Sequence, residues 1–358
     1  MDILFDATVF ELPFSGIAKS TLYLYNACLE LNDALAFTGF IRNQVSYPLP
    51  SRYRIEKLKR SLLGRRYTSS SISRIISKNN FKAIHFPWNG HIPKNLLGIK
   101  KIMTLHDVLP LEIPLYFQDE RQRIKYCSEI QYDLNQADII FTDSEYSKLK
   151  MIENFVLSKE PIVLPFGPTI NQLPSSDYTH KECFFIYVGG YDKRKGIKSM
   201  LKSFFYLHQA RKIDYKLLMI GNYKFIDAET EEIFNQCSSA GIVKQIGYIS
   251  DTSLAEYYSK AIGLIYLSKY EGFGLPPLEA MSLGCPVITT KYTSLPEVCS
   301  DAVLYVEPEN VQDVANAISS LASSTELRLR LHAKGKVQAS KFTWKKSAEI
   351  FLNAIQQK

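Results

Sequence analysis

The chain of 358 residues is long enough for about two domains, and its 46% hydrophobic and 22% charged residues are ordinary for a globular protein with full-sized cores. No apolar run approaches the roughly 20 residues that a membrane-spanning helix requires, and the six widely spaced cysteines form no C-x-x-C pair, which argues against a disulfide framework or a zinc site. The opening MDILFDATVF has no basic leader, so we predict a buried strand instead of a signal peptide and expect a cytoplasmic protein.

Strand and helix patterns alternate through the first half of the chain. The strand DILFDA leads into a helical pattern that begins after Gly16, where apolar residues recur every three or four positions and give one buried face. Further helices are predicted over 119–136 and 144–155. Further strands are predicted in ALAFTGFI, AIHFPW, KIMTLHD, DIIFTDS and PIVLPFG. This alternation favours a parallel sheet that is covered by helices on both faces.

A basic run lies between Arg52 and Lys78. It contains nine Lys or Arg residues and a single acid, Glu56, although the net charge of the whole chain is only +7. Two interpretations stay open at this point: a solvated surface arm, or a surface for anionic lipid or phosphate groups.

The strand and helix alternation restarts after a segment rich in Pro, Ser and Asn, which predicts a linker over 171–182. The second series of strands is CFFIYVGG, YKLLMIG, VKQIGYI, IGLIYLS, CPVITT and AVLYVEP, and its helices include 229–240, 251–260, 310–323, 325–340 and 343–356. We therefore predict an α/β protein with two Rossmann-like, doubly wound domains, 1–170 and 183–341, that face an interdomain cleft. In such sheets ligands bind at the carboxyl ends of the strands.

The segment IYVGGYDKRKGIKSML combines a strand, a turn and the start of a helix. Gly189 and Gly190 let the backbone approach a ligand, and the cations Arg194 and Lys195 stand just before the helix start. Free N–H groups at a helix N-terminus together with two cations favour a diphosphate site, although a surface turn with two solvated bases is the alternative. Gly16 occupies a similar turn, but without a G-x-G-x-x-G pattern it is equally well a simple turn glycine.

The segment EGFGLPPLEA places two carboxylates, Glu271 and Glu279, around a turn constrained by two glycines and two prolines. The turn follows a strand and precedes a helix, and we expect its Phe273 to be exposed. Glu279 is suited to hold a ribose diol and Glu271 to hold sugar hydroxyls, whereas surface charge is the alternative for both acids.

These residues resemble a known family. EGFGLPPLEA is similar to the E-x7-E signature of the retaining glycosyltransferases of the large family 4, which have the GT-B fold, and YVGGYDKRKG, VKQIGYISDTSLAEYYSKA and GCPVITTKYTSLPEVCSDAVLYVEPEN follow the family's order and spacing. In the first half SGIAKS, TLHDVLPLEIP, FTDSEYSK and VLPFG match more loosely. The resemblance implies an acceptor domain in 1–170, a nucleotide-sugar domain in 183–341 and a final helix, 342–358, that returns to the first domain.

The resemblance also implies roles in the donor site. Glu279 would bind the ribose of a nucleotide diphosphate sugar, and Glu271 would hold the transferred sugar and diphosphate. Arg194 and Lys195 would neutralise the leaving nucleoside diphosphate. The other residues assigned to the donor are Gly16, Gly189, Gly190, Tyr248, Ile249, Phe273, Gly274 and Leu275.

Two residues of the first half receive a role from the resemblance alone. His106, after the strand KIMTLHD, would reach the reacting edge of the donor sugar, and Asp107 would contact the acceptor or fix that histidine. A histidine after a strand is otherwise usually a structural hydrogen-bonding residue.

One departure from the family pattern bears on the donor. Many members carry arginine where this chain has Gly190, and a subset with Arg-Lys before the helix, often users of GDP-mannose, also lacks that arginine. The pattern thus favours mannose from GDP-mannose, with a glycan or lipid-linked saccharide as acceptor in cell-surface polysaccharide synthesis. The basic run 52–78 would then hold the protein on the inner face of the membrane, and we expect no nucleic-acid partner.

The chemistry is expected to need neither a metal nor another cofactor, because no D-x-D motif occurs in the sequence. Fixed cations and a helix N-terminus would stabilise the leaving group instead. Two alternatives remain at this point: another enzyme of the same fold, such as a nucleotide-sugar epimerase or a phosphorylase, although the sequence shows no cofactor-lysine site for the latter, and a non-catalytic nucleotide-sugar-binding subunit of a glycosylation complex.

Overall fold

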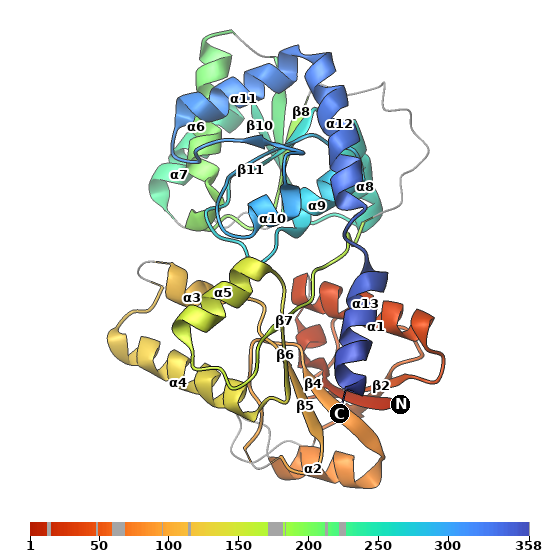
Figure 1. Ribbon diagram of the computed structural model, residues 1–358. Helices are drawn as coiled ribbons and strands as arrows, with labels where there is room; N and C mark the ends of the chain where they lie inside the picture. The colour runs from red at the N-terminus through yellow and green to blue at the C-terminus, as the bar shows by residue number, and fades with distance from the viewer. Residues whose placement is uncertain are drawn as a thin grey trace. The chain divides into compact units, whose positions relative to one another are not determined.

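The computed structural model describes residues 1–12, 16–47, 49–58, 69–94, 96–113, 116–170, 182, 184–211, 214–221 and 227–357 (Figure 1). The chain forms two compact units, and each is described by itself. The first unit comprises Met1–Phe166 and Thr343–Lys358, and the second comprises Gly167–Phe342. The predicted linker, 171–182, lies outside the described residues except for its last residue.

The first unit is built on a seven-stranded sheet in the order β3-β2-β1-β4-β5-β6-β7, in which every pair of neighbouring strands is parallel. Its strands are β1 Asp2–Asp6, β2 Ala36–Ile41, β3 Arg54–Lys57, β4 Phe81–Phe86, β5 Lys100–Thr104, β6 Ile139–Thr142 and β7 Ile162–Val163. Its helices are η1 Ala7–Glu11, α1 Gly16–Leu31, α2 Ser69–Lys78, α3 Leu109–Glu112, α4 Glu120–Gln136, α5 Glu145–Asn154 and α13 Trp344–Gln356. One apolar cluster covers each face of the sheet.

The basic run 52–78 contains two elements that charge patterning did not predict. β3 pairs with β2 as an exposed edge strand, and α2 turns the fully buried Ile72 into the core. The run is therefore part of the folded unit in its described portion. Its residues 59–68, which carry Lys59, Arg60, Arg65 and Arg66, lie outside the described residues.

The last helix, α13, completes the core of the first unit. It packs against α1, as Figure 1 shows. The buried ring of Phe351 lies 5.3 Å from the ring centre of Phe141 and 6.2 Å from that of Tyr25. Trp344, at the start of the helix, stacks on Phe166 with ring centres 5.6 Å apart. The apolar face of α13 thus covers helix and strand residues that lie far away in the sequence.

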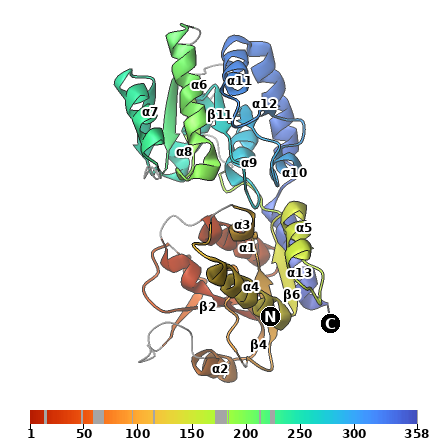
Figure 2. The same cartoon turned by 90° about the vertical axis from the view of Figure 1, so that its left-hand side faces the viewer.

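The second unit is built on a six-stranded sheet in the order β10-β9-β8-β11-β12-β13, again parallel throughout. Its strands are β8 Phe184–Val188, β9 Lys216–Ile220, β10 Val243–Gly247, β11 Gly263–Tyr266, β12 Val287–Thr289 and β13 Leu304–Tyr305. Its helices are η2 Lys193–Lys195, α6 Ile197–Gln209, α7 Ala228–Ser239, α8 Asp251–Lys260, α9 Leu275–Ser282, α10 Leu295–Cys299, α11 Val311–Ser323 and α12 Thr325–Ala339. α6 contacts both α7 and α11, whereas α9 contacts α12, and Figure 2 shows these two groups of helices from the side.

Both sheets contain a point at which the strand order reverses. In the first unit the chain runs outward from β1 to β3 and then resumes on the other side of β1 with β4. In the second unit it runs outward from β8 to β10 and resumes with β11. These reversals confirm the predicted doubly wound α/β architecture of each half. Open parallel sheets bind ligands at the carboxyl ends of the strands that flank such a reversal.

Candidate functional site

The Arg194–Lys195 turn and the Glu271 turn follow the two strands that flank the reversal in the second sheet, β8 and β11. Gly196, the residue before α6, makes their close approach possible. It adopts the left-handed conformation, with φ of 65°, and a Cβ atom at this position would lie only 2.6 Å from the carbonyl oxygen of Leu267. A side chain here would therefore push the cationic turn away from the end of β11.

Lys195 and Glu271 form the centre of a buried charged cluster. The Lys195 Nζ atom lies 2.5 Å from Glu271 Oε1 and 2.8 Å from the hydroxyl of Tyr266. Tyr266 in turn donates to Glu271 Oε1 at 2.9 Å. Arg194 also contacts Glu271, with a guanidinium nitrogen 3.1 Å from the same carboxylate oxygen. The structure thus brings together three of the predicted residues, and Tyr266 is a fourth member that the sequence did not reveal.

The charges of this cluster shift its proton equilibria. Burial alone would raise the pKa of the Glu271 carboxyl above its ordinary 4.5, but the adjoining Lys195 ammonium and Arg194 guanidinium outweigh burial and lower the pKa to about 2. Burial lowers the pKa of the Lys195 ammonium, and Glu271 opposes that change. The carboxylate therefore stays ionised at neutral pH and can accept hydrogen bonds from hydroxyl groups.

Arg194 contacts several acceptors besides Glu271. Its Nε atom lies 3.2 Å from Asp192 Oδ1, and a terminal nitrogen donates to the carbonyl oxygen of Tyr270 at 2.5 Å. Two cations and two carboxylates therefore meet within this group, and their formal charges cancel. An incoming diphosphate would have to exchange partners with Glu271 and Asp192 in order to use both cations.

The turn between β11 and α9 is fixed by the segment that follows β12. Ser294 donates to the carbonyl oxygens of Glu271 and Phe273 at 2.9 and 2.8 Å. Gly274, with φ of 110°, is the residue before α9, and a Cβ there would lie 2.9 Å from a methyl carbon of Leu295. The first helical residue is Leu275, and two prolines follow it, so the turn and the helix start are rigid.

Phe273 is buried, and the prediction of an exposed ring was wrong. Only 3% of Phe273 is accessible, and its ring meets Phe342 edge to face with centres 5.8 Å apart. The glycines on either side suggested an exposed tip in the sequence, but the ring points inward and anchors the turn. This orientation leaves the backbone, and not the phenyl ring, as the part of Phe273 that is available to a ligand.

Glu279 lies on α9 and is also buried. Thr169, from the segment that begins the second unit, donates a hydrogen bond to Glu279 Oε1. The carboxylate is thus held in one orientation before any ligand arrives. Tyr248 and Ile249 follow β10, the outermost strand on that side of the sheet, and Tyr248 is 55% exposed.

The loop that carries Gly189 and Gly190 is tied to the sheet by Tyr187. The hydroxyl of this buried β8 residue donates to the carbonyl oxygen of Gly190 at 2.5 Å. Gly190 itself has open space where a side chain would project. The sheet therefore sets the course of this loop, and no steric contact requires glycine at position 190.

In the first unit His106 forms a closed hydrogen-bonded pair with Asp143. The Nδ1 atom lies 2.9 Å from Asp143 Oδ1, and Nε2 lies 2.9 Å from the carbonyl oxygen of Pro87. Because a carbonyl oxygen only accepts, Nε2 carries a proton. Burial alone would lower the pKa of His106, but the Asp143 carboxylate and the Pro87 carbonyl outweigh burial and raise it above 6.5. Both ring nitrogens are thus engaged inside the unit.

The loop after β4 has an unusual backbone that His106 helps to hold. Asn89, Gly90 and His91 all have positive φ, at 22°, 108° and 75°. Asp133 on α4 accepts from the amides of His91 and Ile92 at 2.6 and 2.9 Å, and Asn89 accepts from the His106 amide at 2.8 Å. Strained backbone at the reversal point of a sheet is a frequent property of functional loops.

Asp107 and Gly16 are the other two residues of the first unit for which the sequence predicted a role. Asp107 is half-buried and accepts from the amide of Leu109 at 2.9 Å, which places its carboxylate at the start of α3. Gly16 is the exposed first residue of α1, and no atom approaches within 4 Å of the position that its Cβ would take. The predicted role of Gly16 therefore has no steric support.

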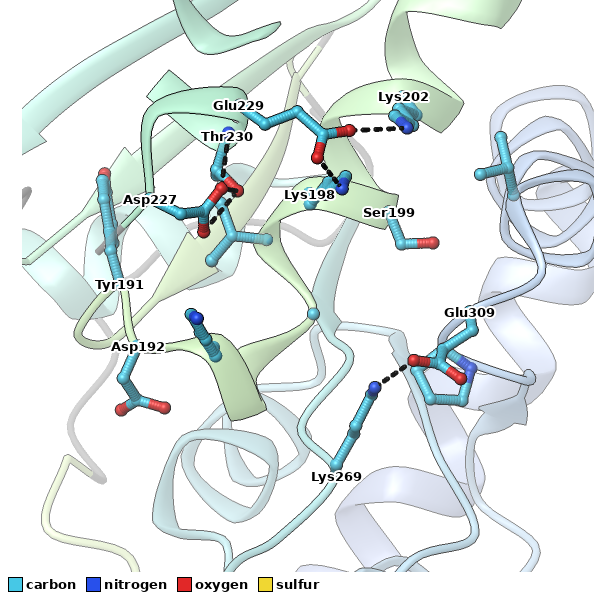
Figure 3. Close-up of a pocket in the computed structure, with 15 residues that line it drawn as sticks. Tyr191, Asp192, Lys198, Ser199, Lys202, Asp227, Glu229, Thr230, Lys269 and Glu309 are labelled. Atoms are coloured by element: carbon cyan, nitrogen blue, oxygen red, sulfur yellow. Dashed lines mark hydrogen bonds and ion pairs between the residues drawn. The ribbon is translucent and has the colours of Figure 1, made fainter. Parts of the chain in front are cut away.

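A pocket of about 540 Å³ lies beside the Lys195–Glu271 cluster in the second unit, and Asp192 is among the residues that line it (Figure 3). It is bordered by the first turns of α6 and α7 and by residues 308–311. Lys198 and Lys202 both pair with Glu229, and Lys269 pairs with Glu309, so these cations in the pocket face acids. Neither Arg194, Lys195 nor Glu271 lines it, and we therefore place the candidate site at the strand ends and not in this pocket.

Within the described residues, no three His, Cys, Asp or Glu side chains converge as a metal site would require. The same part of the chain has no helix that combines the length and the apolar character needed to cross a membrane.

Comparison with known proteins places this geometry in a family. Residues 171–338 match the family model described as glycosyl transferases group 1. We refer to this matched segment as the group 1 domain. This domain contains the Lys195–Glu271 cluster and covers nearly the whole second unit. The match is consistent with the family resemblance noted in the sequence.

Individual relatives extend the similarity into the first unit. The chain is 29% identical over 283 residues to O-antigen chain mannosyltransferase B of Escherichia coli. This alignment covers 74% of this chain and 72% of that protein. It is 25% identical over 281 residues to the serotype-specific mannosyltransferase WbdA of Escherichia coli, again over 74% of this chain but only 34% of that longer protein. Among solved structures, sucrose-phosphate synthase from Thermosynechococcus elongatus superposes with a TM-score of 0.77 at 18% identity, over 99% of this chain and 98% of that one, and confirms the GT-B fold.

Sequence reasoning missed several residues that hold the group 1 domain's turns in place. In the sequence Tyr266 is one of the apolar residues of the strand IGLIYLS, Thr169 lies between the strand PIVLPFG and the predicted linker, and Ser294 lies in a motif that is notable only for its family resemblance. One signal was present for Ser294, because it follows β12 at the same edge of the sheet as Glu271. No local pattern links Thr169 to Glu279, since the two are distant in the sequence.

Proposed function

We propose that the protein is a retaining hexosyltransferase that moves mannose from GDP-mannose to a glycan or lipid-linked saccharide during synthesis of a cell-surface polysaccharide. The observation that carries this proposal is the buried cluster of Lys195, Arg194 and Glu271 at the reversal point of the group 1 domain. A nucleotide diphosphate sugar needs cations for its phosphates and acceptors for its sugar hydroxyls. The cluster offers both within one network.

The residues of the second unit would divide the donor among them. Arg194 and Lys195 would neutralise the diphosphate, assisted by the backbone amides of residues 273–275 at the start of α9. Glu271 would accept from sugar hydroxyls and Glu279 from the ribose. Gly189 and Gly190 would let the loop approach the phosphates, and Tyr248 and Ile249 would border the base. The family resemblance adds Gly16 for the donor, His106 for the reacting edge of the sugar and Asp107 for the acceptor.

The proposed reaction breaks the bond between the anomeric carbon and the phosphate oxygen and forms a bond from that carbon to the acceptor oxygen on the same face. The proton of the acceptor hydroxyl passes to the departing phosphate. The transition state would have oxocarbenium character, and the leaving group would gain negative charge beside Lys195 and Arg194. Fixed cations in a buried site stabilise such charge without reorganising during the reaction. We expect transfer to persist in excess EDTA.

Three observations support mannose and a membrane-linked acceptor. The two Escherichia coli relatives are named as mannosyltransferases, one of them of the O-antigen chain. Gly190 followed by Arg194–Lys195 matches the subset of the family that often uses GDP-mannose. The basic run 52–78, with nine cations, would attract an anionic surface at about 1 kcal/mol per residue and keep the enzyme on the cytoplasmic face of the membrane.

The decisive experiment follows the anomeric protons by NMR. The purified protein is incubated with GDP-mannose in the presence and absence of octyl α-mannoside, and UDP-glucose serves as the alternative donor. We expect a new α-mannosidic signal that requires the acceptor and survives EDTA. A β-linked product would exclude retention, and a changed sugar without acceptor would indicate an epimerase. Absence of turnover with either donor, despite nucleotide binding, would favour a binding subunit.

A further inference from the structure

Tyr266 connects the two charged groups at the centre of the proposed donor site. It is the last residue of β11 and is 2% exposed. Its hydroxyl accepts a hydrogen bond from Lys195 Nζ at 2.8 Å and donates one to Glu271 Oε1 at 2.9 Å. A phenol is able to accept and donate at the same time, and a phenylalanine ring is able to do neither.

The position of the Lys195 ammonium depends on this ring. A lysine side chain has a flexible four-carbon stem and carries its charge as a point. Here the ammonium lies 4.9 Å from the centre of the Tyr266 ring, within range of a cation–π interaction, as well as against the hydroxyl and the Glu271 carboxylate. Tyr266 and Glu271 both accept from this ammonium, so together they restrict its position and orientation.

The same ring also belongs to a rigid part of the sheet. Tyr266 lies parallel to Tyr187 on the adjacent strand β8, with ring centres 6.5 Å apart and planes at 19°. Tyr187 holds the Gly190 carbonyl, so two stacked tyrosines each fix one turn of the site. Groups that are held by strands are placed more accurately than groups that only loops support.

We propose that Tyr266 is a positioning residue: its hydroxyl orients the Lys195 ammonium toward the diphosphate and holds the Glu271 carboxylate in the direction of the sugar. The assignment rests on the function proposed above. It adds that the strength of diphosphate binding depends on a residue that touches neither the nucleotide nor the sugar.

The test compares binding of GDP with binding of guanosine by calorimetry. Tyr266→Phe removes one hydroxyl and keeps the ring. Since a hydrogen bond of this kind typically contributes about 0.5–1.5 kcal/mol, we expect the dissociation constant of GDP to rise roughly 3- to 10-fold. The dissociation constant of guanosine, which has no phosphate, should stay unchanged. Tyr215→Phe is the control, because it removes a hydroxyl of the same unit that donates to the Ala322 carbonyl.

A double-mutant cycle separates positioning from a general structural role. Lys195→Met should weaken GDP binding, and adding Tyr266→Phe to that variant should have no further effect, because the hydroxyl acts through the ammonium. A tyrosine that only supports the fold would weaken GDP equally in both backgrounds and would weaken guanosine as well. Tyr266→Met, which also lacks the hydroxyl, repeats the cycle if Tyr266→Phe gives too little folded protein.

The outcomes distinguish this inference from the proposed function. If the wild-type protein binds none of GDP, UDP, dTDP and ADP, both are wrong. If Lys195→Met weakens GDP binding while Tyr266→Phe binds GDP like the wild type, the function stands and the role of Tyr266 is wrong. Loss of GDP and guanosine affinity together in Tyr266→Phe would also overturn the inference.

Discussion

Each unit places a buried acid–base pair at the carboxyl edge of its parallel sheet, and the two pairs differ in how many of their hydrogen-bonding groups are already used. In the first unit both ring nitrogens of His106 have partners inside the unit, Asp143 and Pro87. In the second unit the Lys195 ammonium, which has three N–H bonds, contacts two acceptors, and the contacts of Glu271 with Lys195, Arg194 and Tyr266 all end on a single oxygen, Oε1.

This difference separates a pair whose hydrogen-bonding groups are all used within the fold from a pair that keeps some of them for a ligand. A closed pair contributes mainly to the free energy of unfolding, because its polar groups would be unsatisfied without each other. An open pair retains donors and acceptors, and its cations can exchange partners when an anion arrives. The comparison therefore predicts that loss of Asp143 changes mainly stability, and that mutations of the Lys195–Glu271 cluster change mainly binding and turnover.

The largest effect is expected from Asp143→Ala, which leaves the His106 ring without its acid. Breaking a buried charged pair typically costs about 3–5 kcal/mol in unfolding free energy. Urea unfolding followed by tryptophan fluorescence measures it, because Trp88 and Trp344, the two tryptophans of the chain, both belong to the first unit. Asp143→Asn should cost less, since an amide can still bond to a neutral ring. Glu120→Ala, an exposed acid, is the control, and a loss as small as the control's would contradict the comparison.

Glu271→Gln should reduce turnover more than stability. The substitution keeps the shape of the side chain but removes the charge that orders Lys195 and Arg194, and removing one such electrostatic group typically lowers kcat by roughly 100- to 1,000-fold. Steady-state kinetics with GDP-mannose measures the change. Glu309→Gln removes an exposed acid of the same unit and should have little effect. Equal kcat in Glu271→Gln and the wild type would remove Glu271 from the reaction.

The two pairs should respond to opposite ends of the pH range. The folded pKa of Glu271, about 2, is below its ordinary 4.5, so its contribution to stability is present above pH 4.5 and is lost as the pH falls toward 2. At about 1.4 kcal/mol per pKa unit the loss is roughly 3 kcal/mol. The folded pKa of His106 is above 6.5, so its contribution is present below pH 6.5 and is lost as the pH rises through the folded value.

Matched variants isolate these contributions. The stability advantage of the wild type over Glu271→Gln, followed by circular dichroism in urea, should shrink in acid. The advantage over Asp143→Asn, followed by tryptophan fluorescence, should shrink in alkali. If both differences vary with pH in the same direction, the assignment of charge to one of the pairs is wrong.

Arg194→Ala should weaken GDP binding by roughly 10- to 100-fold, as expected for the loss of a charge-assisted hydrogen bond of about 1.5–3 kcal/mol. Arg194→Lys should recover part of the loss, because an ammonium keeps the charge but lacks the planar fork that matches two phosphate oxygens. Guanosine affinity should not change. Calorimetry measures both ligands, with Lys198→Ala as the control cation. Normal GDP binding by Arg194→Ala would place the phosphates at the amides of residues 272–275 alone.

The smallest effect is expected from Asp192→Asn. This substitution should strengthen GDP binding, whereas Arg194→Ala should weaken it. Asp192 competes for Arg194 but is 39% exposed, so solvent screens it. Removing its charge should tighten GDP binding by about two- to fivefold and reduce the penalty of exchanging partners. Weaker GDP binding in this variant would mean that Asp192 orients Arg194 instead of competing for it.

Much of the fold could be predicted from apolar periodicity. The helix predicted over 251–260 is α8, residue for residue, and every strand that was predicted overlaps an observed strand. The pattern failed for β3 and α2, because charges dominate the run 52–78 and conceal a short edge strand and a helix with few apolar positions. Short elements with little buried surface give the weakest signals in a sequence.

The charged residues of the second unit could be named in advance, but their arrangement could not. Gly, Pro and the strand ends indicated that Arg194, Lys195 and Glu271 lie near a ligand. That the cations already contact Glu271 depends on Gly196 approaching Leu267, which only the structure shows. The burial of Phe273 depends likewise on Phe342, whose position no local pattern predicts.

The return of α13 to the first unit has a consequence for the order in which the protein is completed during synthesis. Residues 167–342 separate α13 from the rest of its unit. At roughly 5–20 residues per second, a ribosome spends on the order of 10–35 s on that intervening stretch. Throughout this time the nascent first unit lacks Phe351 and its neighbours, so the apolar face of α1 around Tyr25 is left uncovered. The contiguous second unit can complete its core first. The first unit, although its synthesis begins earlier, is therefore the last to complete its core.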